Sequence, residues 1–226
     1  MEDYLDVVYD KKSRPISSYP EKLISYIIDV CELENNNNQI LIEPGVGRGD
    51  HLRIFKDKGF IVRGLDISKR SIKMSPDLDI DLIDSDGRSW PFPDSTFDIV
   101  YSKSFIEHLQ NPEFYMSEAY RVLKPGGKII NLTPDWESCF MKFFDDVTHK
   151  TPFTEVSLEQ ITRMAGFEDV KAYSFRQLPI TWKYPFINFI SSIIAPFVPV
   201  RSTNKFLRWS RELMLIGYGI KPHSRN

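Results

Sequence analysis

The residues best placed for chemistry in this 226-residue chain form a glycine-rich stretch, ILIEPGVGRGDHL, at positions 40–52. Gly45, Gly47 and Gly49 follow an apolar run and precede a segment with helical spacing. Such a strand-to-helix turn lets the backbone approach a ligand, and glycine alone tolerates both the dihedral angles and the contact. Asp50 stands where a dinucleotide-binding fingerprint has its third glycine, and Glu43 precedes the loop. An acid there repels a pyrophosphate and attracts a cationic ligand.

A second acid lies at the end of the next predicted strand. Asp66 comes 21 residues after Gly45, the offset at which an acid accepts hydrogen bonds from ribose hydroxyls. The alternative is that Asp66 is the N-cap of a following helix. S-adenosylmethionine (SAM) carries a ribose, an amino group and a sulfonium. The two acids and the glycines together therefore favour SAM over a nicotinamide dinucleotide.

The sequence predicts seven strands, and the ends of the first two would position these residues. Apolar runs predict strands at 39–43, 60–66, 80–84, 97–102, 127–133, 168–175 and 212–220. Helical spacing lies between them, at 20–31, 112–123 and 157–165. Ser157 and Gln160 form a capping-box pattern at the start of the last helix, and Gly166 ends it. The alternation predicts an α/β fold: a Rossmann-like, mostly parallel sheet with helices on both faces and an antiparallel last strand.

Composition narrows the class further. The length suits a single domain, 1–226, with residues 1–35 as a helical cap and 34–38 as an exposed loop. A net charge of −2 gives no bulk attraction to nucleic acid, which we do not expect as a partner. Cys31 and Cys139 have no metal-type spacing and are expected to be reduced thiols. The acidic N-terminus lacks an apolar signal region, so we expect a cytoplasmic protein.

Four motifs in order give the chain a resemblance to class I SAM-dependent methyltransferases of the small-molecule type. They are the glycine loop with its acid, the acid at position 66, DGRSWPFPDSTFDIV from Asp86, and EAYRVLKPGGKII from Glu118. The one departure is Trp90, where the family often has Leu. The resemblance spans roughly residues 20–175 and implies SAM as cofactor.

The resemblance also implies roles for single residues. Glu43 and the glycines would hold the methionine end of SAM, and Asp66, beside Ile67, the ribose. Asp86, with Gly87 beside it, would bind the adenine amino group, and Ser102 would face the methyl-donor pocket.

Two histidines are candidates for activating the methyl acceptor. His108 follows the fourth predicted strand and His149 the fifth, so both belong at the carboxyl edge of the sheet, where open α/β sheets bind ligands. A hydroxyl or amine acceptor needs a base in addition to correct placement. Each histidine has a structural alternative as a packing or capping residue. Some related O-methyltransferases bind a metal through an E-x-x-E-H motif, but Ser104 replaces its first glutamate here, so we assign no metal.

The stretch 177–210 interrupts the alternation before the last strand. Apolar residues recur at helical spacing, and basic residues follow them. The apolar positions are Phe186, Phe189, Ile190, Ile193, Ile194 and Phe197, and the basic ones are Arg201, Lys205, Arg208 and Arg211. We interpret the stretch as an insertion with three alternative roles: a lid or core element, a peripheral membrane contact through 184–211, or an oligomer interface.

The predicted function is methyl transfer from SAM to a hydroxyl or amine of a small or carrier-linked acceptor, with a sugar of a surface polysaccharide as the first candidate by analogy. The alternative is a lipid or quinone acceptor at the membrane surface. A non-catalytic SAM-binding protein and a nicotinamide-dependent oxidoreductase are the competing classes, and Glu43 and Asp50 argue against the latter.

Overall fold

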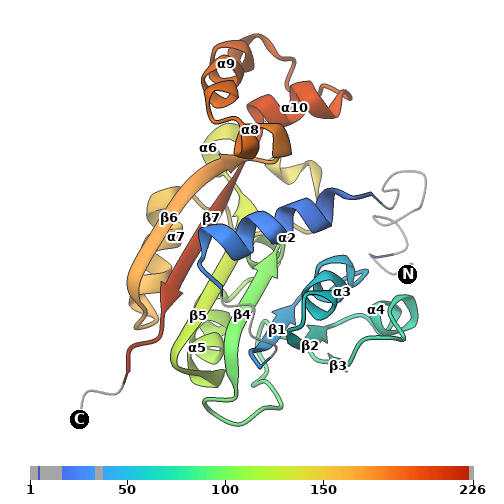
Figure 1. Cartoon of the computed structure of the whole chain (residues 1–226), viewed down its shortest axis with the longest axis vertical. Helices are drawn as coiled ribbons and strands as arrows, with labels where there is room; N and C mark the ends of the chain where they lie inside the picture. The colour runs from blue at the N-terminus through green and yellow to red at the C-terminus, as the bar shows by residue number, and fades with distance from the viewer. Residues whose placement is uncertain (1–4, 6–16, 34–37, 224–226) are drawn as a thin grey trace.

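A seven-stranded sheet forms the centre of the molecule (Figure 1). The computed structural model describes residues 5, 17–33 and 38–223, so the predictions for most of residues 1–16 and for the loop 34–37 lie outside the described residues. The strand order is β3-β2-β1-β4-β5-β7-β6. The strands are β1 (Ile40–Pro44), β2 (Ile61–Asp66), β3 (Ile80–Leu82), β4 (Phe97–Lys103), β5 (Leu123–Pro134), β6 (Glu168–Arg176) and β7 (Leu213–Ile220). All seven predicted strands are confirmed.

Helices cover both faces of the sheet because its central strands are apolar on both sides. Leu41 and its neighbour Ile42 point into different cores, as successive strand residues must. The core that contains Leu41 includes side chains of α2 (Tyr19–Val30) and α3 (Asp50–Asp57). The core that contains Ile42 includes side chains of α5 (Pro112–Val122) and α7 (Glu155–Met164). The predicted Rossmann-like α/β fold is therefore confirmed.

The start of α7 differs from its prediction. Its N-cap is Thr154, whose side chain accepts a hydrogen bond from the Ser157 backbone N–H, while the Ser157 hydroxyl accepts one from the Thr154 N–H. The predicted box of Ser157 with Gln160 is wrong because the helix begins earlier, at Glu155. Gly166 follows the helix with a positive φ, as predicted.

The direction of β7 decides where the inserted segment lies. β7 is antiparallel to both β5 and β6, so β6 ends and β7 begins at the carboxyl edge of the parallel strands. The connection between them, residues 177–212, therefore lies over that edge. It forms α8 (Pro179–Lys183), α9 (Phe186–Ile194), the 3₁₀ turn η3 (Ala195–Phe197) and α10 (Lys205–Arg211), which Figure 1 shows together at the top of the molecule.

Short elements complete the described chain: α4 (Lys69–Met74), η1 (Ile106–His108), α6 (Trp136–Cys139) and η2 (Phe143–Asp145). Cys31 and Cys139 are both free thiols, as predicted, and both are buried. Within the described ranges, no helix is both long and apolar enough to span a bilayer.

Candidate functional site

A cavity of about 1350 Å³ opens at the carboxyl edge of the sheet. Loops after β1, β2, β3, β4 and β5 contribute to its wall, and α10 and the start of β7 close the far side. Pockets for one small ligand usually measure about 300–1,000 Å³. This cavity therefore has room for a cofactor and a second substrate.

The glycine loop forms one wall of this cavity. Gly45 and Gly47 line it, and both have positive φ, at 73° and 56°. A side chain on Gly45 would overlap the ring of Phe105. The Gly47 N–H donates to Asp66 Oδ2 at 2.8 Å, so the acid after β2 fixes the loop after β1. The sequence pattern predicted this turn correctly, and the bond to Asp66 explains how the two motifs act together.

Asp66 and Ile67 line the cavity beside the glycine loop. The alternative role of Asp66 as a helix N-cap is wrong, because Ser68 is the N-cap of α4 and its hydroxyl accepts from the Arg70 N–H at 2.9 Å. Asp66 Oδ1 instead accepts from the Ser68 N–H at 2.8 Å. Its place on the cavity wall agrees with the predicted ribose contact, which stays a prediction.

Glu43 lies behind the loop and not on the cavity wall. It is buried, its Oε2 has no hydrogen-bond partner among the described residues, and its Oε1 lies 3.7 Å from His51 Nδ1. Burial, with Asp50 nearby, raises the pKa of Glu43 well above its ordinary value, and burial lowers the pKa of His51 to about 3. A cationic group bound on the other side of the loop would favour the ionised form of this carboxyl.

Besides Glu43, three more predicted cofactor residues do not line the cavity. The prediction for Ser102 is wrong: its side chain is fully buried and bonds Asn131 Oδ1 at 2.8 Å. Gly49 is the N-cap of α3, where a side chain would overlap Ser75, so its role is structural. Gly87 also lies off the wall, and a Cβ there would meet nothing within 4 Å.

Asp86 lines the cavity, as predicted, but its carboxylate already has partners. It accepts from the N–H groups of Gln110 at 2.8 Å and Asn111 at 2.7 Å, just before α5 begins. These bonds hold the loop after β3 against the loop after β4. The contact with adenine stays a prediction.

Several wall residues were missed by the sequence reasoning. They are Ser68 after β2, Ile83, Asp84 and Ser85 after β3, and Lys103, Ser104 and Phe105 at the end of β4. They share one feature that could have predicted them: all lie at or just after the carboxyl ends of parallel strands, where such sheets bind ligands. Ser104 also has a positive φ of 52°, which no sequence pattern indicated.

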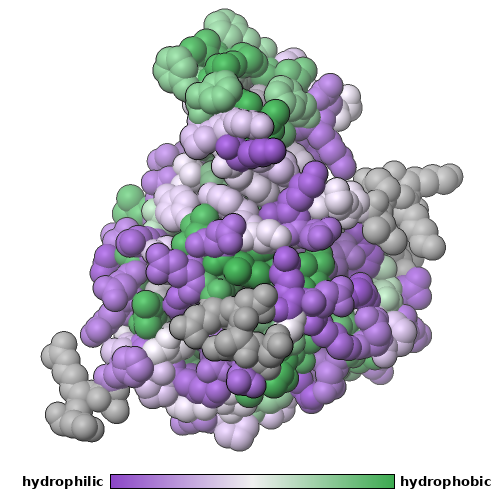
Figure 2. Space-filling model, viewed as in Figure 1, coloured by the Kyte–Doolittle hydropathy of each residue, from purple (hydrophilic) through white to green (hydrophobic). Residues whose placement is uncertain are grey.

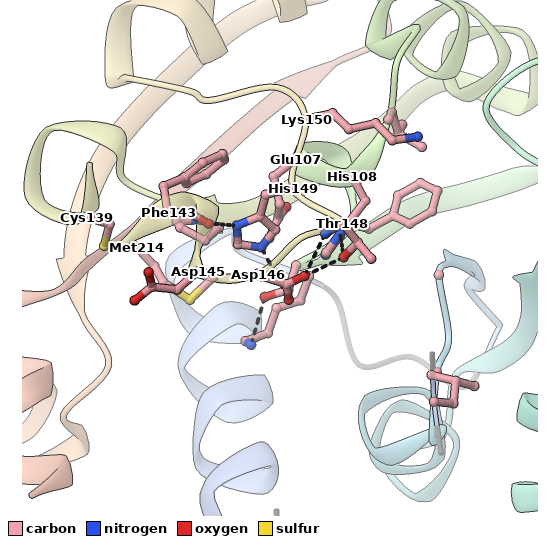
Figure 3. A pocket seen from close by; sticks show the side chains of 18 of the residues that line it. Glu107, His108, Cys139, Phe143, Asp145, Asp146, Thr148, His149, Lys150 and Met214 are labelled. Atoms are coloured by element: carbon pink, nitrogen blue, oxygen red, sulfur yellow. Dashed lines mark hydrogen bonds and ion pairs between the residues drawn. The ribbon is translucent and has the colours of Figure 1, made fainter. Parts of the chain in front are cut away.

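His108 and His149 come together on the opposite side of the cavity (Figure 3). Their ring centroids are 4.8 Å apart. The contact depends on backbone hydrogen bonds, because the Glu107 carbonyl accepts from the N–H groups of Lys150 at 2.8 Å and Thr151 at 3.0 Å. The loop after β5 is thereby fastened to η1. The sequence placed both histidines at this edge but not in contact.

Hydrogen bonds assign the proton on each imidazole. His149 Nδ1 lies 2.6 Å from the Phe143 carbonyl, which only accepts, so Nδ1 carries the hydrogen. The Thr148 hydroxyl donates to Asp146 Oδ1 at 2.6 Å, so its oxygen accepts from His108 Nδ1 at 2.9 Å. In both neutral rings the lone pair is therefore on Nε2. Burial lowers the pKa of His108, which favours the neutral ring.

Glu107 stands beside this pair and is fully buried. Its Oε2 accepts from the Thr133 hydroxyl at 3.0 Å, whereas its Oε1 has no hydrogen-bond partner in the described structure. Burial raises the pKa of Glu107 to about 7. Ligand atoms of Glu107, His108 and His149 all lie within 4.8 Å of one another, a set that could hold a metal ion.

Comparison with known proteins gives a family for this fold and site. Residues 42–131 match the model of the methyltransferase domain family. An uncharacterized protein of Methanocaldococcus jannaschii is 33% identical over 138 residues, covering 58% of this chain and 65% of that protein. A 2-methyl-6-phytyl-1,4-hydroquinone methyltransferase of Spinacia oleracea is 30% identical over 180 residues, covering 74% of this chain and 50% of that enzyme. The chain thus spans less than two thirds of these relatives.

Solved structures agree on the fold. A SAM-dependent methyltransferase from Archaeoglobus fulgidus aligns with a TM-score of 0.67 at 22% identity, covering 96% of this chain and all of that one. A phosphoethanolamine N-methyltransferase of Haemonchus contortus, in complex with SAM, aligns with a TM-score of 0.67 at 16% identity, covering 99% of this chain and 61% of that one. Residues 42–131 therefore carry a methyltransferase domain, and the chain has the fold of the SAM-dependent methyltransferases, which supports SAM as its cofactor.

Proposed function

We propose that this protein transfers a methyl group from SAM to a hydroxyl or amine of a lipid or lipid-linked acceptor, which it meets at a membrane surface. The observation that carries the acceptor class is an exposed apolar surface on α9 and η3, beside the far wall of the cavity.

The cofactor half of the site fits SAM. We define it as the loops after β1, β2 and β3. Gly45 and Gly47 provide a side-chain-free wall, Asp66 offers carboxylate oxygens for ribose, and Ile67, 69% exposed, offers an apolar face. Bound there, SAM supplies an electrophilic methyl group on a sulfonium. The geometry of the loop orients that end of the cofactor, with the buried carboxyl of Glu43 behind it.

The acceptor half consists of η1, the loop 143–151 and α10. His108 and His149 line this part of the cavity with Nε2 lone pairs in their neutral forms. A positioned lone pair of this kind takes the proton from a hydroxyl or amine, or would hold a metal ion that lowers the pKa of the acceptor hydroxyl. We assign acceptor activation to this pair.

The apolar surface lies on the inserted segment and is not covered by the rest of the chain. Phe189 is 71% exposed and Phe197 is 84% exposed. With Phe186, Ile190, Ile193 and Ile194 they form a cluster that Figure 2 shows as the green top of the molecule. The alternative of a core element is therefore wrong for this face. Contiguous exposed apolar surface of this kind marks a contact with a membrane or partner.

The basic residues around the apolar surface favour a membrane over a protein as its partner. Residues 177–211 contain five basic residues and no acidic one: Lys183, Arg201, Lys205, Arg208 and Arg211. Lys183 and Lys205 are exposed on either side of α9 in the chain. Apolar insertion combined with basic residues is the pattern that binds anionic lipid surfaces. Because Lys205, Arg208 and Trp209 also line the cavity, a lipid-linked acceptor has a short path into it.

The relatives are consistent with such an acceptor. The name of the spinach enzyme specifies a phytyl-substituted hydroquinone, which is a lipid, while other relatives are named for phosphoethanolamine. A polysaccharide sugar on a lipid carrier would contact the same apolar surface through its carrier. The lipid anchor is the shared feature that we propose.

Vesicle sedimentation of the purified chain tests this proposal. The chain should pellet with anionic vesicles at low salt and much less with neutral ones, and the double variant Phe189→Ser/Phe197→Ser should stay in the supernatant. Met164→Ser is the matched control, since Met164 is 79% exposed on α7. Absence of pelleting by the unmodified chain, or equal pelleting of all variants, would refute the membrane role.

A further inference from the structure

We propose that Glu107, His108 and His149 form a binding site for a divalent transition-metal ion such as Zn²⁺, on the acceptor side of the cavity. The sequence reasoning assigned no metal because Ser104 replaces a glutamate. The proposed set does not use residue 104. Its third ligand comes from the loop after β5, which only the fold brings beside η1.

The first argument is the unpaired carboxylate oxygen. Glu107 is fully buried, and its Oε1 has no hydrogen-bond partner among the described residues. A buried polar atom without a partner is costly unless something else satisfies it. One carboxylate oxygen of Glu107 and one ring nitrogen of each histidine all lie within 4.8 Å of one another. Between a carboxylate and two neutral imidazoles, a divalent cation satisfies all three groups.

The hydrogen bonds at Nδ1 of both histidines also favour a metal site. Metal-binding imidazoles usually donate their other N–H to a carbonyl, carboxylate or water, which fixes the tautomer. His149 donates Nδ1–H to the Phe143 carbonyl, and His108 donates Nδ1–H to Thr148, which Asp146 orients in turn. Both rings therefore carry their lone pair on Nε2, as a metal ligand requires.

The third argument is ligand chemistry. Two imidazoles and one carboxylate form the ligand set of catalytic zinc and of related transition metals, and three protein ligands leave a position open. Glu107, His108 and His149 all line the cavity, so an acceptor hydroxyl or a water could complete the shell. This last role rests on the proposed function, whereas metal binding itself does not.

Calorimetric titration of the chelator-treated full chain with ZnCl₂ tests the site, with Co²⁺ absorption as a second readout. One ion per chain should bind, and the Co²⁺ spectrum should lack a thiolate charge-transfer band. Glu107→Gln keeps the acceptor for Thr133, and His149→Asn keeps a donor for Phe143 while removing Nε2. Each should weaken binding at least as much as loss of an outer-shell partner does, about 10–100-fold.

Two controls make the result decisive. Cys139→Ser should bind Zn²⁺ normally, because Cys139 lines the same cavity but is not in the set. SAM affinity and the melting temperature without metal should stay near those of the unmodified chain in Glu107→Gln and His149→Asn, which shows that both variants fold. No 1:1 binding by the unmodified chain, or unchanged binding in both folded variants, would overturn the proposal. The test needs neither acceptor nor membrane, so its failure is distinct from failure of the proposed function.

Discussion

The cofactor half and the acceptor half of the cavity are built in different ways. In the cofactor half, contiguous motifs at strand ends supply the wall, and one bond from Gly47 to Asp66 joins them. In the acceptor half, His108 and His149 come from two loops far apart in the sequence, which are held together by bonds to the Glu107 carbonyl. The cofactor half should therefore keep its geometry when residues elsewhere are changed. The geometry of the acceptor half depends on contacts between loops that are far apart in the sequence.

The comparison predicts that the two halves can be disabled separately. With an acceptor available, His108→Ala or His149→Ala should reduce turnover by roughly 10²–10⁴-fold, because the acceptor loses its activating group. SAM affinity should stay nearly normal. Steady-state kinetics with parallel SAM titrations measure both, and His223→Ala is the control, since His223 lies outside the cavity. Full turnover in both cavity variants would remove acceptor activation from this pair.

The converse change is made in the glycine loop. Gly47→Val should abolish measurable SAM binding, because a β-branched side chain is strained at a φ of 56° and enters ligand space. Gly87→Ala is the matched control, since its added Cβ meets nothing within 4 Å. Calorimetry should show loss in the first variant and ordinary binding in the second. Undiminished affinity of a folded Gly47→Val would show that SAM does not bind along this loop.

A smaller effect is expected at the membrane-facing surface. Reversing charge at Lys183 and Lys205 should weaken binding to anionic vesicles by about ten-fold or more, since each basic residue near such a surface contributes about 1 kcal/mol. Pelleting at matched low salt measures the change. Binding to SAM in solution should not alter, because neither lysine belongs to the cofactor half. Vesicle affinity that ignores the reversal would leave the apolar residues as the sole determinant.

The smallest effect concerns stability and pH. The folded pKa of Glu43 is raised, so its contribution to stability is fully present below about pH 4.5 and is lost as pH rises through the folded pKa. Glu43→Gln should therefore become more stable relative to the unmodified chain as pH rises above 4.5. Denaturant unfolding without SAM measures this difference. A difference independent of pH would mean that the buried carboxyl does not control stability here.

The sequence predicted most of the fold and much of the cofactor half. Apolar runs predicted all seven strands, most clearly β1 and β4, because strands buried on both faces have few polar residues. Gly45, Gly47 and Asp66 were found because their chemistry is tied to short spacings. Ser102 was misjudged, since strand alternation turns it into the core, where Asn131 binds it. The position of α7 was shifted because Thr154 competes with Ser157 as N-cap.

The acceptor half could not be predicted in the same way. Nothing in the spacing of His108 and His149 indicates contact, because backbone bonds between two loops create it. The exposure of the α9 surface was also undetermined. Helical spacing of apolar residues shows a stripe, but only the path of the chain between β6 and β7 decides whether that stripe meets the core or the solvent.

We propose that the loops after β1 to β3 bind SAM independently of the acceptor half. Calorimetric titration of the unmodified chain and of the double variant His108→Ala/His149→Ala with SAM and with NAD tests it most directly. We expect equal SAM affinity in both proteins and no heat from NAD. Tight NAD binding by the unmodified chain, or loss of SAM binding in a folded double variant, would contradict it.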